Sequence, residues 1–275
     1  MLEEAIVTAL VVGAGAVEDS WAPVLRALQP YFDFPLTVDG ANAFMARLIY
    51  SLRFWSAESA VKEYTVLLRQ RSEILSKIAE ALRSAETSGE LRARAELASV
   101  LNDFVIGRCT RLVVITTNWD SVVDVALRRH VGTAVPVDAP LHIHGSIEES
   151  TTLYLPTEVI REKYRSSQEE EELSVLHGSA VTQLQEANRV IVYGLSLSPL
   201  DAELSQLLAS GLQSCNLQEV VVVSPEHQLV AQRVNLLFSR LREIRVIGYR
   251  HDQLLGPSDY TVSRESTPRA REHSS

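Results

Sequence analysis

Two short loops carry side chains suited to acid–base chemistry on a bound ligand. The run VVITTNWD places Asn118 and Asp120 directly after an apolar stretch, and LHIHGS places His144 at the end of another. A histidine titrates near working pH and can accept a proton, while an amide and a carboxylate can hold hydroxyl groups or water in place. Each residue also has a structural interpretation: Asn118 and Asp120 can cap the following helix, and His144 can be a satisfied buried histidine.

A glycine-containing turn precedes both loops. Gly13-Ala14-Gly15 follows an apolar run at residues 5–12 and leads into a predicted helix. Small residues let the backbone approach a phosphate, and exposed N–H groups at a helix start favour an anion. A dehydrogenase fingerprint would place a third glycine at position 18, where the chain has Glu18, so this class is disfavoured. In isolation, the turn fits a phosphate site and a plain strand-to-helix connection equally well.

The elements that must position these loops alternate along the chain. Apolar, β-branched runs predict strands at 5–12, 111–116, 140–144, 189–193, 219–223 and 243–247. Amphipathic stretches predict helices at 120–129, 168–187, 200–209 and 225–238. Such alternation predicts an α/β fold with a Rossmann-like parallel sheet flanked by helices. Because ligands bind at the carboxyl ends of such strands, we expect the three loops to converge on one crevice.

Residues 41–104 have a different texture. Apolar residues at helical spacing and dense charge pairs predict three helices with a break at 87–89, a helical insert that forms a lid or a small subdomain. We expect residues 1–255 to form one domain that includes this insert, and the polar tail at 256–275 to be disordered. The apolar side chains of the insert exceed what one buried stripe needs, which predicts a homo-oligomer. They include Phe44, Met45, Leu48, Ile49, Tyr50, Leu52, Phe54 and Trp55.

Composition narrows the class of protein further. A net charge of −9 over 275 residues disfavours direct nucleic-acid binding, because phosphate contacts need a basic face. The two cysteines, Cys109 and Cys215, cannot form a four-thiolate zinc site, and we expect no metal. The N-terminal apolar run opens with two glutamates, unlike a signal peptide. No stretch approaches the ~18 apolar residues of a membrane span. We therefore expect a cytoplasmic protein without a membrane partner.

Four motifs in order carry a family resemblance. GAG after the first strand, TTNWD after the second, HGS after the next and VYGLSLSPLD near the end look like the motif series of SIR2-like (sirtuin-type) proteins. The resemblance covers about residues 5–250, and TTNWD with HIHGS is its specific part. The form with TTN-aromatic-D, HGS and no zinc cysteines is more similar to bacterial SIR2-like NAD hydrolases, often linked to phage defence, than to protein deacylases.

The resemblance implies an NAD glycohydrolase, with NAD as substrate, that releases nicotinamide and ADP-ribose through an oxocarbenium-like state. In this interpretation Asn118 orients the ribose hydroxyls or the water, His144 is the base and Asp120 fixes the loop. The residues expected to bind NAD are Gly13, Ala14, Gly15, Thr117, Gly145, Gly194 and Ser196. A regulatory partner protein that switches the activity on in anti-phage defence is also part of this expectation.

Two other functions stay open. Val17 stands where the family usually has a serine, and Glu18 and Asp19 bring two carboxylates near the expected diphosphate. These residues favour a module that senses or scaffolds around NAD or ADP-ribose without turnover. A protein deacylase is the third reading, weakened by the missing zinc cysteines.

Two further histidines need an assignment. His142 lies two residues before His144 and would share its strand face, so it supports the base or replaces it. The second HGS string, at His177, lies in a helical pattern and is given no role.

Overall fold

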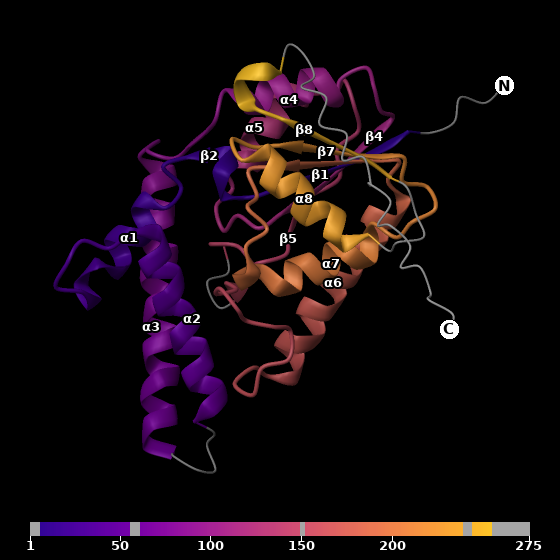
Figure 1. Cartoon of the computed structure of the whole chain (residues 1–275). Coiled ribbons are helices and arrows are strands. Elements are labelled where there is room, and N and C mark those ends of the chain that lie inside the picture. Colours follow the sequence, from indigo (N-terminus) through magenta and orange to yellow (C-terminus); the bar gives the residue numbers. More distant parts are fainter. Residues whose placement is uncertain (1–5, 56–60, 149–151, 239–243, 255–275) are drawn as a thin grey trace, which may run out of the picture.

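In the computed structural model, a six-stranded parallel sheet is covered by helices on both faces (Figure 1). The structure describes residues 6–55, 61–148, 152–238 and 244–254, so the tail predicted to be disordered lies outside the described residues. The sheet strands are β1 (Val7–Val12), β4 (Arg111–Thr116), β5 (Leu141–His142), β6 (Arg189–Tyr193), β7 (Glu219–Val223) and β8 (Arg245–Tyr249). The predicted α/β, Rossmann-like fold is confirmed.

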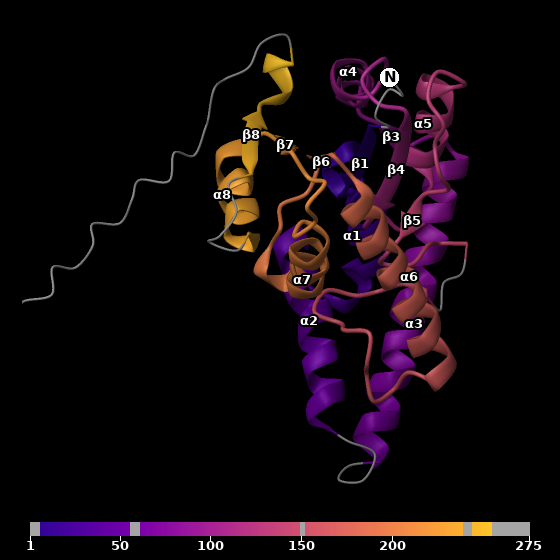
Figure 2. The ribbon, with the colours of Figure 1, turned by 90° about the vertical axis from the view of Figure 1, so that its right-hand side faces the viewer.

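The strand order explains where a ligand can enter the fold. The order is β5-β4-β1-β6-β7-β8, and each neighbouring pair is parallel (Figure 2). Numbered by chain position, the six sheet strands follow the Rossmann order 3-2-1-4-5-6. The direction of winding reverses between β1 and β6. The carboxyl ends of these two strands therefore border the crevice that such sheets use for ligands.

The helices form one layer on each face of the sheet. On one side lie α1 (Ala22–Leu28), α2 (Val38–Phe54), α3 (Val61–Thr87), α4 (Glu96–Phe104) and α5 (Val122–Val131). On the other lie α6 (Ser167–Glu186), α7 (Ala202–Gly211) and α8 (His227–Leu237). Alternate residues of each strand feed two cores, because strand side chains point to opposite faces. In β1, Leu10 and Val12 join the first core, and Ala9 and Val11 join the second.

Helices α2, α3 and α4 occupy the predicted insert, and α3 ends at Thr87, at the predicted break. In Figure 1, α2 and α3 run side by side away from the sheet. They still pack against the sheet, because Ile74 and Ile78 of α3 belong to the same hydrophobic core as Leu10 of β1. No helix within the described ranges is both long and apolar enough to pass through a lipid bilayer.

A small ladder was not predicted. The strands β2 (Val17–Glu18) and β3 (Arg92–Ala93) pair in antiparallel fashion, with Val17 opposite Ala93 and Glu18 opposite Arg92. The N–H of Arg94 then donates to the oxygen of Ala16 at 2.9 Å. This ladder ties the segment between α3 and α4, within the insert, to the turn that follows β1.

Candidate functional site

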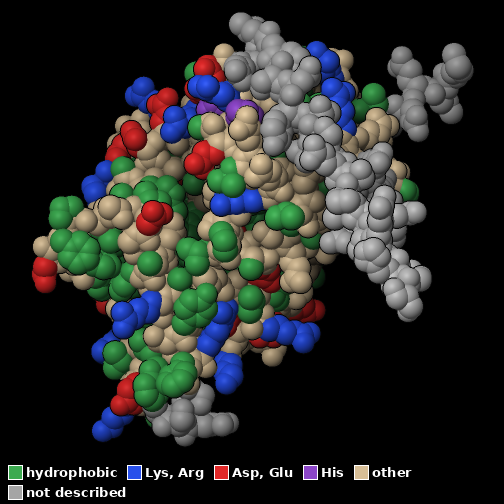
Figure 3. Space-filling view, viewed as in Figure 1, with side chains coloured by type: hydrophobic (Ala, Val, Ile, Leu, Met, Phe, Trp, Pro, Cys, Tyr) green, Lys and Arg blue, Asp and Glu red, His purple; other side chains and the backbone are tan. Residues whose placement is uncertain are grey.

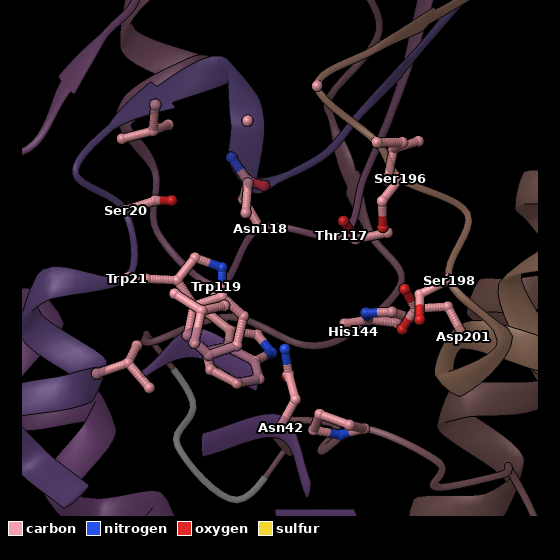
Figure 4. Close-up of a pocket in the computed structure, with 18 of the residues that line it drawn as sticks. Ser20, Trp21, Asn42, Thr117, Asn118, Trp119, His144, Ser196, Ser198 and Asp201 are labelled. Atoms are coloured by element: carbon pink, nitrogen blue, oxygen red, sulfur yellow. The ribbon is translucent and has the colours of Figure 1, made fainter. Parts of the chain in front are cut away.

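A cleft of about 1160 Å³ opens at the carboxyl ends of β1, β4 and β6, where the strand order reverses. Most of the side chains and turns expected to bind or react lie in its wall (Figure 4). They are Ala14, Gly15, Thr117, Asn118, Asp120, His144, Gly194 and Ser196. The other two, Gly13 and Gly145, are buried and do not line the cleft. The structure thus brings the three predicted loops together.

Asn118 is held by its backbone and leaves its side chain unpaired. Its N–H donates to Oγ1 of Thr116 at 3.0 Å, and its carbonyl oxygen lies 2.9 Å from Nδ1 of His142. The side chain lines the cleft in a residue only 4% exposed, and neither amide atom has a partner within the described ranges. Asn118 therefore does not act as a helix cap. A buried amide without partners is available to a ligand that supplies both an acceptor and a donor.

Asp120 accepts a hydrogen bond from the following helix and has a raised pKa. Its Oδ1 accepts the N–H of Val122, the first residue of α5, at 3.2 Å, although the N-cap position of this helix is Ser121 and not Asp120. Burial raises the pKa of Asp120 to about 6, and the Val122 amide and the charge of His142 oppose this while the charge of Glu86 adds to it. The carboxylate in the cleft wall therefore gains and loses its proton near physiological pH.

His144 presents a neutral ring to the cleft. Its imidazole stacks on Tyr154, with centroids 5.4 Å apart and an interplanar angle of 8°. Burial, together with a smaller effect of the charge of His177, lowers the pKa of His144 to about 3. No hydrogen bond between described residues engages the ring, and Figure 4 shows it beside the opening near Ser198 and Asp201. A neutral imidazole can accept a proton from a bound water or hydroxyl.

The predicted shared face of His142 and His144 is not formed. β5 ends at His142, and the chain then turns, with the N–H of Gly145 donating to the oxygen of His142 at 2.9 Å. Gly145 has φ +75°, and a Cβ there would lie 2.1 Å from the oxygen of Thr152, so only glycine fits. His142 does not line the cleft, and its two ring nitrogens lie within hydrogen-bond distance of the Asn118 carbonyl oxygen and of Asp124.

The second HGS string lies in a helix, as predicted, yet contacts the site. His177 belongs to α6, and its Nε2 lies 2.9 Å from the backbone oxygen of Ile143. The rings of His177 and Tyr154 pack at 5.9 Å between centroids. His177 therefore supports the backbone and the stacking partner of His144, a role the sequence did not indicate.

The glycines at the switch point interlock two loops. The N–H of Gly13 donates to Tyr193 oxygen at 3.0 Å, and that of Gly15 to Gly194 oxygen at 2.9 Å. The N–H of Ala16 donates to Gly13 oxygen at 2.9 Å. These amides are thus engaged within the protein and do not point freely at a diphosphate. Within the described residues, Ala14 keeps the one amide of this turn with no bond to the protein backbone.

Gly194→Ala is expected to be far more destabilising than Gly107→Ala. Both glycines have φ near +70°, which costs a residue with a side chain roughly 1–2 kcal/mol. A Cβ at Gly194 would also lie 2.4 Å from the nitrogen of Ala16, whereas one at Gly107 meets nothing within 4 Å. Urea unfolding of both variants measures the difference, which we expect to exceed about 2 kcal/mol. If both variants lost the same stability, the turn after β1 and the loop after β6 could move apart without an energetic cost.

Several cleft residues escaped the sequence analysis. Arg94 and Arg233 line the cleft, and a guanidinium nitrogen of Arg233 donates to the oxygen of Ser196 at 2.6 Å. Trp21 and Asn42, from the N-terminus of α1 and from α2, also line the cleft (Figure 4). None of these residues directly follows a strand of the six-stranded sheet, so the rule that ligands bind at the carboxyl ends of its strands could not find them.

Glu18 and Asp19, the two carboxylates expected near the diphosphate, lie in different parts of the structure. Asp19 lines the cleft, whereas Glu18 does not and pairs across the small ladder with Arg92.

The cleft therefore offers arginines and a free amide for an anion, and a buried amide, a neutral imidazole and a carboxylate for a reacting centre. Such a set can hold a phosphorylated ligand and assist the loss of a leaving group. Compared with known proteins, the chain matches no family model and no curated protein.

Proposed function

We propose that the protein is an NAD hydrolase that cleaves the nicotinamide–ribose bond to give nicotinamide and ADP-ribose. The observation that carries this proposal is the Asn118 amide, buried in the cleft wall with neither polar atom hydrogen-bonded to any described residue. A ribose offers hydroxyl groups that donate and accept, which suits such an amide. The resemblance of GAG, TTNWD and HGS to the SIR2-like motif series supports the same activity.

The proposed binding mode uses the two arginines of the cleft, whose wall also carries the acidic residues Asp19, Asp39, Asp201 and Glu226. Arg94 and the N–H of Ala14 lie on the side of the glycine turn and bind the diphosphate, since guanidinium groups pair well with phosphate oxygens. Arg233 and Ser196 line the adenosine side. The nicotinamide riboside then extends towards Asn118, where the reacting groups are.

The proposed reaction needs little acid catalysis. The bond between C1′ and the pyridinium nitrogen breaks, and its electron pair stays with nicotinamide, which leaves as a neutral molecule. The positive charge that develops on the ribose is stabilised by the carboxylate of Asp120, a group that is itself mostly buried. Water adds to C1′, and its proton passes to the His144 ring and then to solvent. A weakly basic imidazole suffices, because water becomes acidic once it has added to the cation.

Nicotinamide release from NAD by the purified chain tests the proposal, and we expect one ADP-ribose for each nicotinamide. His144→Ala is expected to lower kcat by about 10–100-fold, below the usual contribution of a general base because the pKa of His144 is so low. His130→Ala, an exposed position on α5, serves as the matched control. Equal rates in wild type and His144→Ala would remove His144 from the mechanism.

A binding module without turnover is the second candidate. The engaged amides of Gly13 and Gly15 and the presence of Asp19 in the cleft favour it, because they weaken diphosphate binding. Calorimetry with ADP-ribose, beside the nicotinamide assay, separates the two functions: binding without release supports a sensor. Release that depends on an added acyl-peptide would instead indicate a deacylase. Release that depends on a partner protein would support switched activity in phage defence.

A homo-oligomer remains a prediction of its own. Apolar side chains gather on the surface of α2 and α3 and of the segment just before α2, among them Phe34, Tyr50, Phe54 and Val61, all more than half exposed (Figure 3). Contact between subunits would remove this apolar surface from water. Light scattering over a range of protein concentrations measures the mass, and a monomer at every concentration would contradict the prediction.

A further inference from the structure

The imidazole of His142 lies between two hydrogen-bond acceptors behind the cleft wall. Its Nδ1 is 2.9 Å from the backbone oxygen of Asn118, and its Nε2 is 3.0 Å from Oδ2 of Asp124. The side chains of His142 and Asp124 are mostly buried, 16% and 14% exposed. The ring therefore joins the end of β5, the loop after β4 and the first turn of α5.

Both partners can only accept hydrogen bonds. A backbone carbonyl and an ionised carboxylate carry no proton, and a neutral imidazole has a single N–H. The two bonds therefore form together only when His142 is an imidazolium. Burial lowers the pKa of His142, but the bond to Asp124 and its charge, the Asn118 carbonyl and the charge of Asp120 outweigh burial and raise it. Asp124 from α5 and Asp120 from the loop are the charged groups that face the ring.

We propose that the protonated His142 is a positioning residue that, by holding the carbonyl of Asn118, fixes the loop from which the Asn118 amide enters the cleft. This inference rests on the proposed function. Among the described residues, the backbone of Asn118 itself has one other hydrogen bond, from its N–H to Thr116, while the flanking residues are held by the bonds of Thr117 N–H to Val12 and of Ile147 N–H to Trp119. The carbonyl of Asn118 therefore depends on His142 for its position between these two fixed neighbours. Loss of one ring proton breaks one of the two His142 bonds and loosens the unpaired amide.

The consequence is a fall in NAD cleavage as pH rises. Because the pKa of His142 is raised, the cation persists to higher pH than that of an ordinary histidine, and activity declines as this cation is lost. Asp124→Asn keeps an acceptor for Nε2 but removes the charge, so we expect the midpoint of the decline to move down by about one pH unit or more. His142→Gln removes the titration, so its rate is lower and shows no such decline.

Two readouts across the same pH range test the proposal. NMR of histidine-labelled protein follows the His142 ring, and the side-chain amide signals of Asn118 report its order. We expect both to change with the midpoint of the activity decline, in wild type and in Asp124→Asn. His130→Gln, at an exposed histidine at the end of α5, is the matched control and keeps the wild-type decline. Circular dichroism checks that each variant is folded.

The outcomes separate this inference from the proposed function. The positioning role is overturned, even in an active enzyme, if His142 is neutral at mildly acidic pH. It is also overturned if the Asn118 amide signals do not change as His142 titrates. A protein that releases no nicotinamide overturns the proposed function. In that case a common midpoint of the two NMR signals still supports the coupling, and separate midpoints refute it.

Discussion

Asn118→Ala is expected to lower kcat/KM for NAD cleavage by about 10²–10³-fold, the usual loss when one preorganised group that contacts the transition state is removed. The amide lies in the cleft wall with no partner within the described part of the chain, so its interactions are reserved for the ligand. The measurement is nicotinamide release under saturating and limiting NAD. Asn102→Ala, at an exposed asparagine of α4, is the matched control.

The same variant should not lose stability, which distinguishes a ligand-binding amide from a structural one. An unsatisfied buried polar group costs roughly 1–3 kcal/mol, and alanine removes that cost while giving up some packing. We therefore expect a free energy of unfolding equal to or above that of wild type. ADP-ribose should raise the Tm of wild type and leave that of Asn118→Ala nearly unchanged. A variant destabilised by several kcal/mol would show that Asn118 serves the fold instead.

Where a strand is buried on both faces of the sheet, its first and last residues could be predicted from the sequence. The predicted strands at 111–116, 189–193 and 219–223 match β4, β6 and β7, because each is an apolar run bounded by polar residues. The edge strand β5 was predicted at 140–144 but ends at His142, since the positive φ of Gly145 turns the chain earlier. Edge strands have one neighbour and a weaker pattern, so their ends depend on the turn that follows.

The site was predictable only as far as it follows strand ends. Asn118 and His144 stand directly after apolar runs, and the rule that ligands meet the carboxyl ends of parallel strands brought them together. Arg94 is different: it reaches the cleft through a two-residue ladder between β2 and β3, which has no detectable period. The unpaired state of the Asn118 amide depends on contacts distant in sequence, and no local pattern encodes it.

Asp120→Asn is expected to lower the activity and to raise the stability of the protein. In wild type the two properties depend on pH in opposite ways: activity falls as pH drops, whereas stability falls as pH rises. Only the carboxylate can stabilise the charge on the ribose, so wild-type activity should fall as pH drops through about 6, the raised pKa of Asp120. The asparagine variant keeps an oxygen for the Val122 amide but carries no charge. We expect its kcat to be about 10²-fold lower and to show no acid decline.

The stability change follows from proton linkage. An unfolded aspartate loses its proton near pH 4, while folded Asp120 keeps its proton up to about pH 6. Wild type therefore loses stability as pH rises between these values, by at most about 3 kcal/mol, and the loss persists at neutral pH. Asparagine does not titrate, so Asp120→Asn should be the more stable protein at neutral pH and equal to wild type below about pH 4.

Urea unfolding at both pH values measures this difference, with the exposed Asp33→Asn as control. If Asp120→Asn were more stable than wild type by the same amount at neutral pH and below about pH 4, the change of side chain, and not the buried charge, would be the cause. Full activity of Asp120→Asn at neutral pH would mean that the cleft does not use this carboxylate. The two results together decide whether the fold accepts a buried charge at Asp120 because the reaction requires it.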